Sequence, residues 1–121
     1  MFLNLSHHPS AQWSPAQREA AEALGGEVVD QAFPEIPPVA SEAEVAALGG
    51  QLVAEILGRK PDAAMVQGEF TLAFFLVREL QLRTIPCFAA TTKRISRVER
   101  QADGSSRTVS VFEFVRFRRY W

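Results

Sequence analysis

Four short polar segments carry the side chains that could do chemistry, and the first three directly follow apolar stretches of the chain. The segments are Ser6-His7-His8, Gln67-Gly68-Glu69, Thr91-Thr92-Lys93-Arg94 and Arg116-Phe117-Arg118-Arg119-Tyr120-Trp121. If the apolar stretches before the first three segments are parallel strands, their carboxyl ends meet at one edge of a sheet. Ligands of open α/β sheets bind at that edge. The spacing therefore predicts one shared site built from segments far apart in the chain.

The two adjacent histidines offer acid–base chemistry. A histidine at this edge could act as a base, an acid or a phosphate ligand near neutral pH, because imidazole exchanges its proton there. The alternative is a pair of solvated loop side chains. A zinc site is not predicted, since adjacent side chains diverge and no Cys, His or Asp cluster has the spacing of metal ligands.

The segment Gln67-Gly68-Glu69 is typical of a turn between a strand and a helix. Gly68 would let the backbone approach a ligand closely, and the helix start would offer free N–H groups to an anion. Glu69 suits the helix dipole, which is a structural role, and its charge would repel an anion. Gln67 could read a base edge or position a ribose hydroxyl. No established phosphate-binding motif is present.

Hydroxyls and cations together suit phosphate oxygens, and Thr91, Thr92, Lys93 and Arg94 supply both. The alternative is a polar strand end that leads into a hairpin. Near the chain end, basic and aromatic residues interleave, as they do where bases stack on rings while cations hold phosphates. A dimer interface explains these exposed aromatic residues equally well.

The elements that must position these segments alternate between β and α. Strands are predicted near residues 1–5, 27–33, 63–66 and 85–90, with helices at 14–24, 41–58 and 69–82. Ser14 and Ser41 begin helices with the pattern of capping boxes, completed by Gln17 and Glu44. The third helix is apolar on nearly every side and is expected to be buried, while Gly49-Gly50 would allow the second to pack closely on the sheet.

Two further strands, at 93–101 and 107–120, flank an Asp-Gly turn and predict a C-terminal β-hairpin. The fold class is therefore α/β: a single Rossmann-like domain over residues 1–121, with a mostly parallel sheet and helices on both faces. The hairpin is expected to extend one sheet edge or to form a dimer contact.

Charge is unevenly spread along the chain. Residues 1–82 hold four basic and eleven acidic side chains, whereas residues 83–121 hold nine basic and three acidic ones. A basic segment on an acidic body favours a polyanionic ligand such as a nucleotide, or charge pairing across a dimer. A duplex-DNA reader is disfavoured, because no helix carries a basic face.

The single cysteine, Cys87, has no internal disulfide partner, which favours a reducing, cytoplasmic setting. It lies in an apolar strand, so a buried core role is favoured over a redox or nucleophilic one. The N-terminus lacks the pattern of a signal peptide, and no stretch is long and apolar enough for a membrane span.

Taken together, these motifs resemble the small CRISPR-associated ring nucleases, single-domain relatives of CARF sensor domains. The segments that carry the resemblance are Asn4-Leu5-Ser6-His7-His8-Pro9, Gln67-Gly68-Glu69-Phe70, Ala90-Thr91-Thr92-Lys93-Arg94 and Val115-Arg116-Phe117-Arg118-Arg119-Tyr120. They span nearly the whole chain. The doubled histidine leaves open whether His7 or His8 matches the family's histidine.

The resemblance implies a cytoplasmic homodimer that binds a cyclic oligoadenylate, foremost cyclic tetra-adenylate, and opens it without a metal or cofactor. The catalytic residues would be His7 or His8 for proton transfer and Lys93 and Arg94 for the phosphate charge. The ligand contacts would come from Asn4, Ser6, Gln67, Gly68, Glu69, Thr91, Thr92, Arg116 and Arg118. The main alternative is a sensor or sponge that binds the ring without cutting it, and a third is an accessory protein that acts through protein contacts alone.

Overall fold

A computed structural model describes residues 1–121 and contains five strands and three α-helices. The elements are β1 (Phe2–Ser6), the short 3-10 helix η1 (Ser10–Gln12), α1 (Pro15–Gly25), β2 (Val28–Ala32), α2 (Glu42–Arg59), β3 (Ala63–Val66), α3 (Phe70–Leu82), β4 (Cys87–Arg100) and β5 (Ser106–Arg119). The strands form one sheet in the order β2-β1-β3-β4-β5. The first four are parallel and β5 is antiparallel to β4, so the predicted α/β fold with a C-terminal hairpin is confirmed. No helix has the length and apolar character that a membrane crossing requires.

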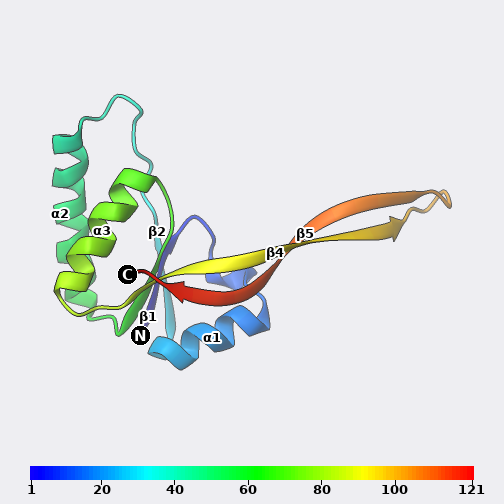
Figure 1. Cartoon of the computed structure of the whole chain (residues 1–121), viewed down its shortest axis with the longest axis horizontal. Coiled ribbons are helices and arrows are strands. Elements are labelled where there is room, and N and C mark those ends of the chain that lie inside the picture. Colours follow the sequence, from blue (N-terminus) through cyan, green and yellow to red (C-terminus); the bar gives the residue numbers. More distant parts are fainter.

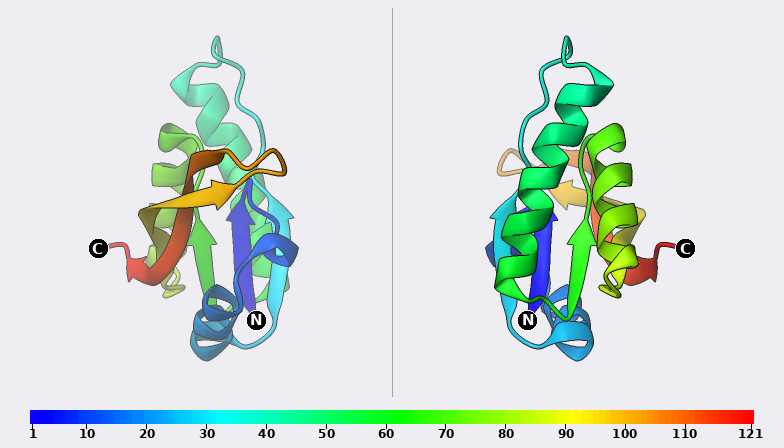
Figure 2. Two further views of the ribbon diagram at one scale, coloured as in Figure 1. Left: turned by 90° about the vertical axis from the view of Figure 1, so that its right-hand side faces the viewer. Right: turned by 90° about the vertical axis from the view of Figure 1, so that its left-hand side faces the viewer.

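The sheet separates two apolar clusters, because successive side chains of a strand point to opposite faces. On one face Leu3 and Leu5 pack with the apolar sides of α2 and α3. On the other face Phe2 packs with Ala21 of α1. Figure 2 shows α1 on one side of the strands and the α2–α3 pair on the other. The face under α1 is the smaller cluster, and it continues onto β5 through Phe117.

The helix starts follow the sequence pattern in full at Ser41 and in half at Ser14, where only the bond to the serine hydroxyl forms. Ser14 accepts a hydrogen bond from Gln17 N, and Ser41 and Glu44 form a complete capping box at the start of α2. Gly49 permits a different contact from the predicted one. A Cβ atom there would lie 2.3 Å from the Phe75 ring, so the glycine makes room for α3 and not for the sheet.

The prediction that α3 is a buried helix holds for one side of the helix only. Phe70 is 90% exposed, Phe74 is 70% exposed and Leu82 is 71% exposed. The helix lies in an outer layer, where the sheet and α2 cover only part of its circumference. Its outer side is therefore apolar and open to solvent.

The separate strands predicted at 85–90 and 93–101 are one continuous strand, β4. β5 pairs with it from Phe88 to Arg100, and a register shift lies between Thr91 and Thr92. Asp103 and Gly104 make the predicted turn, with Gly104 at a φ of +86°. Residues 92–114 leave the sheet as a long two-stranded arm, which Figure 1 shows projecting from the rest of the molecule.

Candidate functional site

Three segments that are distant in sequence meet in one hollow on the α1 side of the sheet. His8, Gln67 and Thr92 contribute to its lining. The hollow has a volume of about 390 Å³, and its other lining residues are Gln12, Trp13, Gln17, Met65, Ala90 and Phe112. Gln67 follows β3, and its Oε1 accepts a hydrogen bond of 2.5 Å from the backbone N–H of Ala90 in β4. That bond fixes the side chain and leaves its NH₂ group for another acceptor.

Asn4 and Ser6 hold the loop that carries His8. The Asn4 Nδ2 donates to the His8 carbonyl at 2.8 Å, and the Ser6 Oγ accepts from the His8 N–H at 3.1 Å. Ser6 Oγ in turn donates to Asn4 Oδ1 at 2.7 Å. Asn4 is 1% exposed and Ser6 is 5% exposed, so they position the loop from below and do not line the hollow.

Asp30 completes this network, and sequence reasoning missed it. Its carboxylate accepts from Asn4 Nδ2 at 3.0 Å and from Ser10 N at 3.1 Å, while Arg18 Nη2 donates to the Ser10 carbonyl at 3.0 Å. Although burial raises the pKa of Asp30, the hydrogen bonds from Asn4 and Ser10 and the charge of Arg18 lower it below its ordinary value. Asp30 stands opposite Asn4 in the parallel register. An acidic residue in the middle of a short predicted strand is the feature of the sequence that could have indicated this role.

We expect Asp30 to make stability sensitive to acid. Its pKa is lower in the folded chain than the ordinary 3.8, so its stabilising contribution is complete above that pH and is lost as pH falls toward the folded value. The variant Asp30→Asn should therefore lose less of its stability than the wild type between neutral pH and pH values below 3.8. Urea midpoints across this range measure the effect. An exposed control, Glu22→Gln, should follow the wild-type profile, and identical profiles for all three proteins would contradict the assignment.

The two histidines separate in space. His7 packs against Phe33, with ring centroids 5.6 Å apart and ring planes tilted by 53°, and does not line the hollow. His8 does line it. The structure thus places one histidine, His8, beside Gln67 and Thr92.

Gly68 and Glu69 do not offer an anion site of the predicted kind. A Cβ atom on Gly68 would lie 2.4 Å from the Phe33 ring, so this glycine accommodates a buried side chain. Glu69 caps α3 itself, accepting from Leu72 N at 2.8 Å and from Thr71 N at 3.0 Å. These hydrogen bonds, the one from Leu72 first, lower the pKa of Glu69. The expected free N–H groups are therefore occupied by the carboxylate of Glu69.

The segment Thr91–Arg94 does not present all four side chains to one crevice, because it lies inside a strand, where neighbours alternate between faces. Thr92 and Arg94 share the face of the hollow, and alternation places Lys93 on the opposite face. Arg94 stands opposite Phe112 in the register and donates to Ser110 Oγ at 3.1 Å. The segment was expected at the end of a strand that stops at residue 90, whereas β4 continues through it to Arg100.

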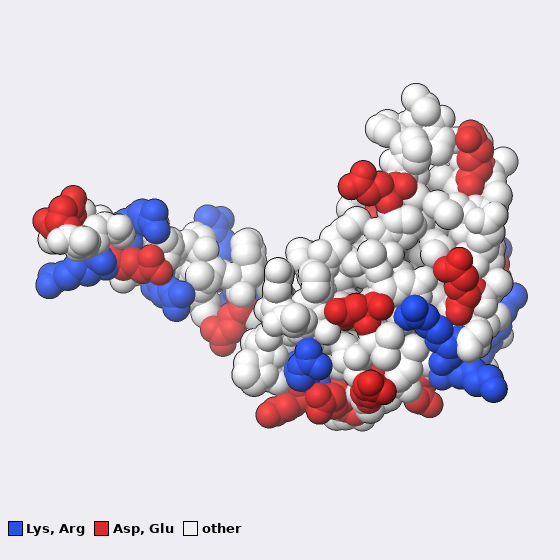
Figure 3. All heavy atoms as spheres, turned by 180° about the vertical axis from the view of Figure 1, so that it is seen from behind, with Lys and Arg blue, Asp and Glu red and all other residues white.

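The remaining predicted residues lie on the two strands of the hairpin: Thr91 on β4, and Arg116 and Arg118 on β5. Thr91 Oγ1 donates to the Arg116 carbonyl at 2.9 Å and accepts from Arg116 N at 3.2 Å, so this hydroxyl supports the register shift. Arg118 is exposed and stands opposite Ala89. Neither arginine lines the hollow. Both signs of charge alternate along the arm in Figure 3, so its surface is mixed and not uniformly basic.

Cys87 is fully buried, in agreement with the predicted core role. Burial raises the pKa of its thiol to about 12, against a smaller opposing influence of Arg119. At pH 8 only roughly one thiol in 10⁴ is then the reactive thiolate. We expect Ellman's reagent to modify the native protein at least about 100-fold more slowly than the urea-unfolded chain. Equal rates in the two states would show that the thiol is accessible.

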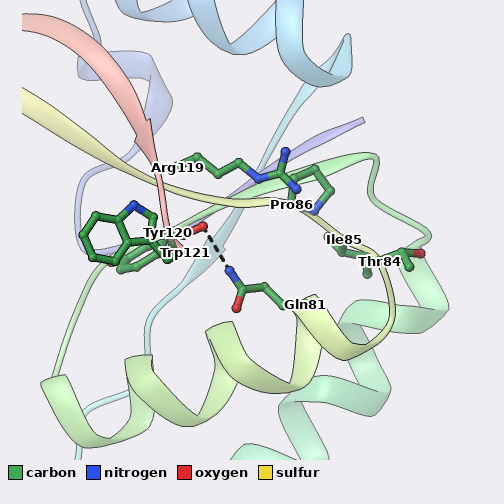
Figure 4. A pocket seen from close by; sticks show the side chains of 7 residues that line it. All are labelled: Gln81, Thr84, Ile85, Pro86, Arg119, Tyr120 and Trp121. Carbon is green, nitrogen blue, oxygen red and sulfur yellow. Dashed lines mark hydrogen bonds between the residues drawn. The ribbon is translucent and has the colours of Figure 1, made fainter.

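A second cavity, of about 610 Å³, lies where the chain ends beside the start of β4 (Figure 4). Arg119, Tyr120 and Trp121 line it together with Gln81, whose Nε2 donates to the Tyr120 carbonyl at 3.1 Å. The cavity is larger than the hollow, but it contains no histidine and no carboxylate. It offers no imidazole for proton transfer, whereas His8 lines the hollow, so the hollow is the better candidate. Nowhere in the chain do three His, Cys, Asp or Glu side chains gather in a way that could hold a metal ion.

Comparison with known proteins gives a family but no characterised relative. No curated protein and no solved structure shows a significant match to the chain. One family model matches residues 1–118, which is nearly the whole sequence. The chain therefore belongs to the uncharacterized protein MJ1673 family.

Proposed function

We propose that the protein is a ring nuclease that binds a cyclic oligoadenylate, foremost cyclic tetra-adenylate, and opens it without a metal. The observation that carries the proposal is the meeting of His8, Gln67 and Thr92 in one hollow with two aromatic side chains. In this role the protein would switch off type III CRISPR signalling, as the motif resemblance implies.

The lining suits an adenosine unit. Trp13 and Phe112 present ring surfaces on which a base can stack. Gln12, Gln17 and Gln67 supply amide groups, which can donate to and accept from the edge of adenine. A hollow of about 390 Å³ holds one nucleoside of the ring and leaves the others outside.

The proposed reaction uses the nucleophile that RNA carries. The ribose 2′-oxygen attacks the adjacent phosphorus, the bond from phosphorus to the 5′-oxygen breaks, and a 2′,3′-cyclic phosphate and a 5′-hydroxyl form. His8 takes the proton of the 2′-hydroxyl as general base, and the departing 5′-oxygen is protonated by water or by the same imidazolium. The protein mainly holds the attacking oxygen in line with the scissile bond.

Two side chains on the face of the sheet that carries the hollow would contact the charged phosphate. Gln67 donates from its NH₂ group, which the bond to Ala90 N orients. Arg94 lies outside the lining, opposite Phe112, and its guanidinium would leave Ser110 Oγ to contact the phosphate. Lys93 has no part in this mechanism, since it lies on the other face of β4. A two-fold symmetric ring suits a homodimer, because each protomer presents the same groups.

A second candidate function is binding without cleavage. It is favoured by the lining of the hollow, which includes no lysine or arginine to stabilise the developing charge. A sensor or sponge needs only the stacking and amide contacts.

The test is incubation of the purified protein with cyclic tri-, tetra- and hexa-adenylate in EDTA, with products resolved by chromatography. Linear oligoadenylate that ends in a cyclic phosphate supports the nuclease and identifies its ring. Rings that stay intact, in EDTA and again with magnesium, would exclude it. Calorimetry on the same samples then separates a binding protein from one with no nucleotide role.

A further inference from the structure

The projecting arm leaves the outer edges of both of its strands without a partner, and the edge of β5 is the longer of the two. β5 is the last strand of the sheet, and beyond the register shift its residues 106–114 pair only with β4. On the arm, Val98 is 68% exposed and Phe112 is 71% exposed. An isolated two-stranded ribbon is marginally stable in water, and an exposed regular edge is a template for another strand. The arm therefore has the properties of an assembly surface.

The hydrogen-bond pattern determines which backbone groups of β5 face outward. Two backbone hydrogen bonds fix the pattern at the two ends of the hairpin: Tyr120 N donates to the Cys87 carbonyl, and Gln101 N donates to the Ser105 carbonyl. At both ends, therefore, the backbone N–H and C=O groups of odd-numbered β4 residues face β5. Hydrogen-bonded and non-bonded pairs alternate along an antiparallel ladder, so Ser96 and Ser110 form a non-bonded pair. The N–H and C=O of Ser110, and of every second residue on either side of it, then point away from β4.

We propose that the arm pairs with the arm of a second copy of this chain, β5 against β5 in antiparallel orientation, with a two-fold axis at Ser110. Only even-numbered arm residues present outward backbone groups, so they must pair with each other. Ser110 is also the middle residue of the regular segment 106–114. This register joins two five-stranded sheets into one.

The side chains select the same register. A two-fold axis at Ser110 places Arg107 opposite Glu113 of the second copy and Val109 opposite its Val111. Each of these pairs occurs twice, once on either side of the axis. Opposite charges and paired β-branched residues stabilise neighbouring antiparallel strands. A shift of the axis by one residue in either direction instead places Glu113 opposite a serine or a valine. Glu113 is the only acid in β5. It stands opposite Lys93 of β4, and the Ser110 register adds Arg107 of the second copy on its other side.

The pairing also bears on the hollow. A two-fold axis perpendicular to the sheet keeps equivalent side chains on the same face, so both Phe112 rings lie on one side of the joined sheet. They are four residues apart along the strands, which is about 14 Å. Thr108 of the second copy stands opposite Phe112, at the arm side of the hollow. One cyclic oligoadenylate could span both hollows, and that statement rests on the proposed function. The strand pairing itself does not rest on it.

Cysteine cross-linking tests the register directly. In Ser110→Cys the two thiols lie opposite one another across the axis, with Cα atoms about 5.5 Å apart, within the range of a disulfide. The matched control is Thr108→Cys, on the same exposed face, whose two copies are four residues out of register. We expect mild oxidation to convert Ser110→Cys to a covalent dimer at least about tenfold faster than Thr108→Cys. Equal rates, or no cross-link in either variant, would overturn the proposed register.

Charge reversal tests the pairing without a covalent bond. Arg107→Glu and Glu113→Arg each create two like-charge contacts in a homodimer, and we expect each to weaken dimerisation about tenfold. Mixing the two variants restores both opposite-charge pairs in a heterodimer, so light scattering should recover the dimer mass. A wild-type protein that stays monomeric at high concentration, or a mixture no more dimeric than its components, would overturn the proposal. No nucleotide is present in either assay, so these outcomes are independent of ring cleavage.

Discussion

Replacing His8 with alanine should reduce the cleavage of cyclic tetra-adenylate by about 10²- to 10⁴-fold, the usual contribution of a general acid or base. The fold should be unaffected, because the loop is held through the backbone of His8, by Asn4 and Ser6. Binding should persist, since the aromatic and amide lining remains. Single-turnover rates and calorimetric affinities measured on the same preparation separate the two effects.

The matched control is the neighbouring histidine. His7 contacts Phe33 and lies outside the hollow, so His7→Ala should retain cleavage within a few-fold of the wild type. If His7→Ala loses activity and His8→Ala keeps it, the assignment of the hollow is wrong. Loss of affinity in His8→Ala, with the cleavage rate per bound ring unchanged, would show that His8 binds the ring and takes no part in proton transfer.

The parts of the fold that sequence predicted well are those set by local rules. Ser14 and Ser41 begin helices because their side chains satisfy free backbone N–H groups, and Gly104 turns the hairpin because a positive φ is easy for glycine. Alternating β and α stretches implied a parallel sheet, and carboxyl strand ends in such a sheet meet at one edge. His8 and Gln67 could therefore be placed together without any knowledge of the contacts between them.

The errors arise where tertiary contacts decide. Gly68 and Gly49 look like glycines that admit a ligand or a sheet, but each makes room for one phenylalanine ring from elsewhere in the chain. Lys93 and Arg94 were placed together because a strand was expected to end at residue 90. Pairing with β5 extends that strand by ten residues, to Arg100, and alternation then separates the two cations. Asp30 was missed because its role depends on its partners, Asn4 and Ser10, and neither is near it in sequence.

Two adjacent glycines in α2 should respond in opposite ways to the same substitution. Gly50 has open space where a Cβ would be, so Gly50→Ala should raise the free energy of unfolding by about 1 kcal/mol through helix propensity. Gly49→Ala gains the same propensity but places its Cβ 2.3 Å from the Phe75 ring. Overpacking of this kind costs about 1–3 kcal/mol. Because the propensity gain is common to both variants, their difference in stability isolates the contact between α2 and α3.

A double-mutant cycle identifies the ring as the cause. In a Phe75→Leu background the side chain opposite Gly49 is smaller and more adaptable, so the difference between Gly49→Ala and Gly50→Ala should shrink toward zero. Urea unfolding followed by tryptophan fluorescence measures all the free energies on one scale. A difference that persists unchanged in this background would mean that Gly49 is required by the helix backbone and not by Phe75. The close approach of α2 to α3 matters for the site as well, because α3 begins at Phe70, three residues after Gln67, and a shift of the helix would move that amide in the hollow.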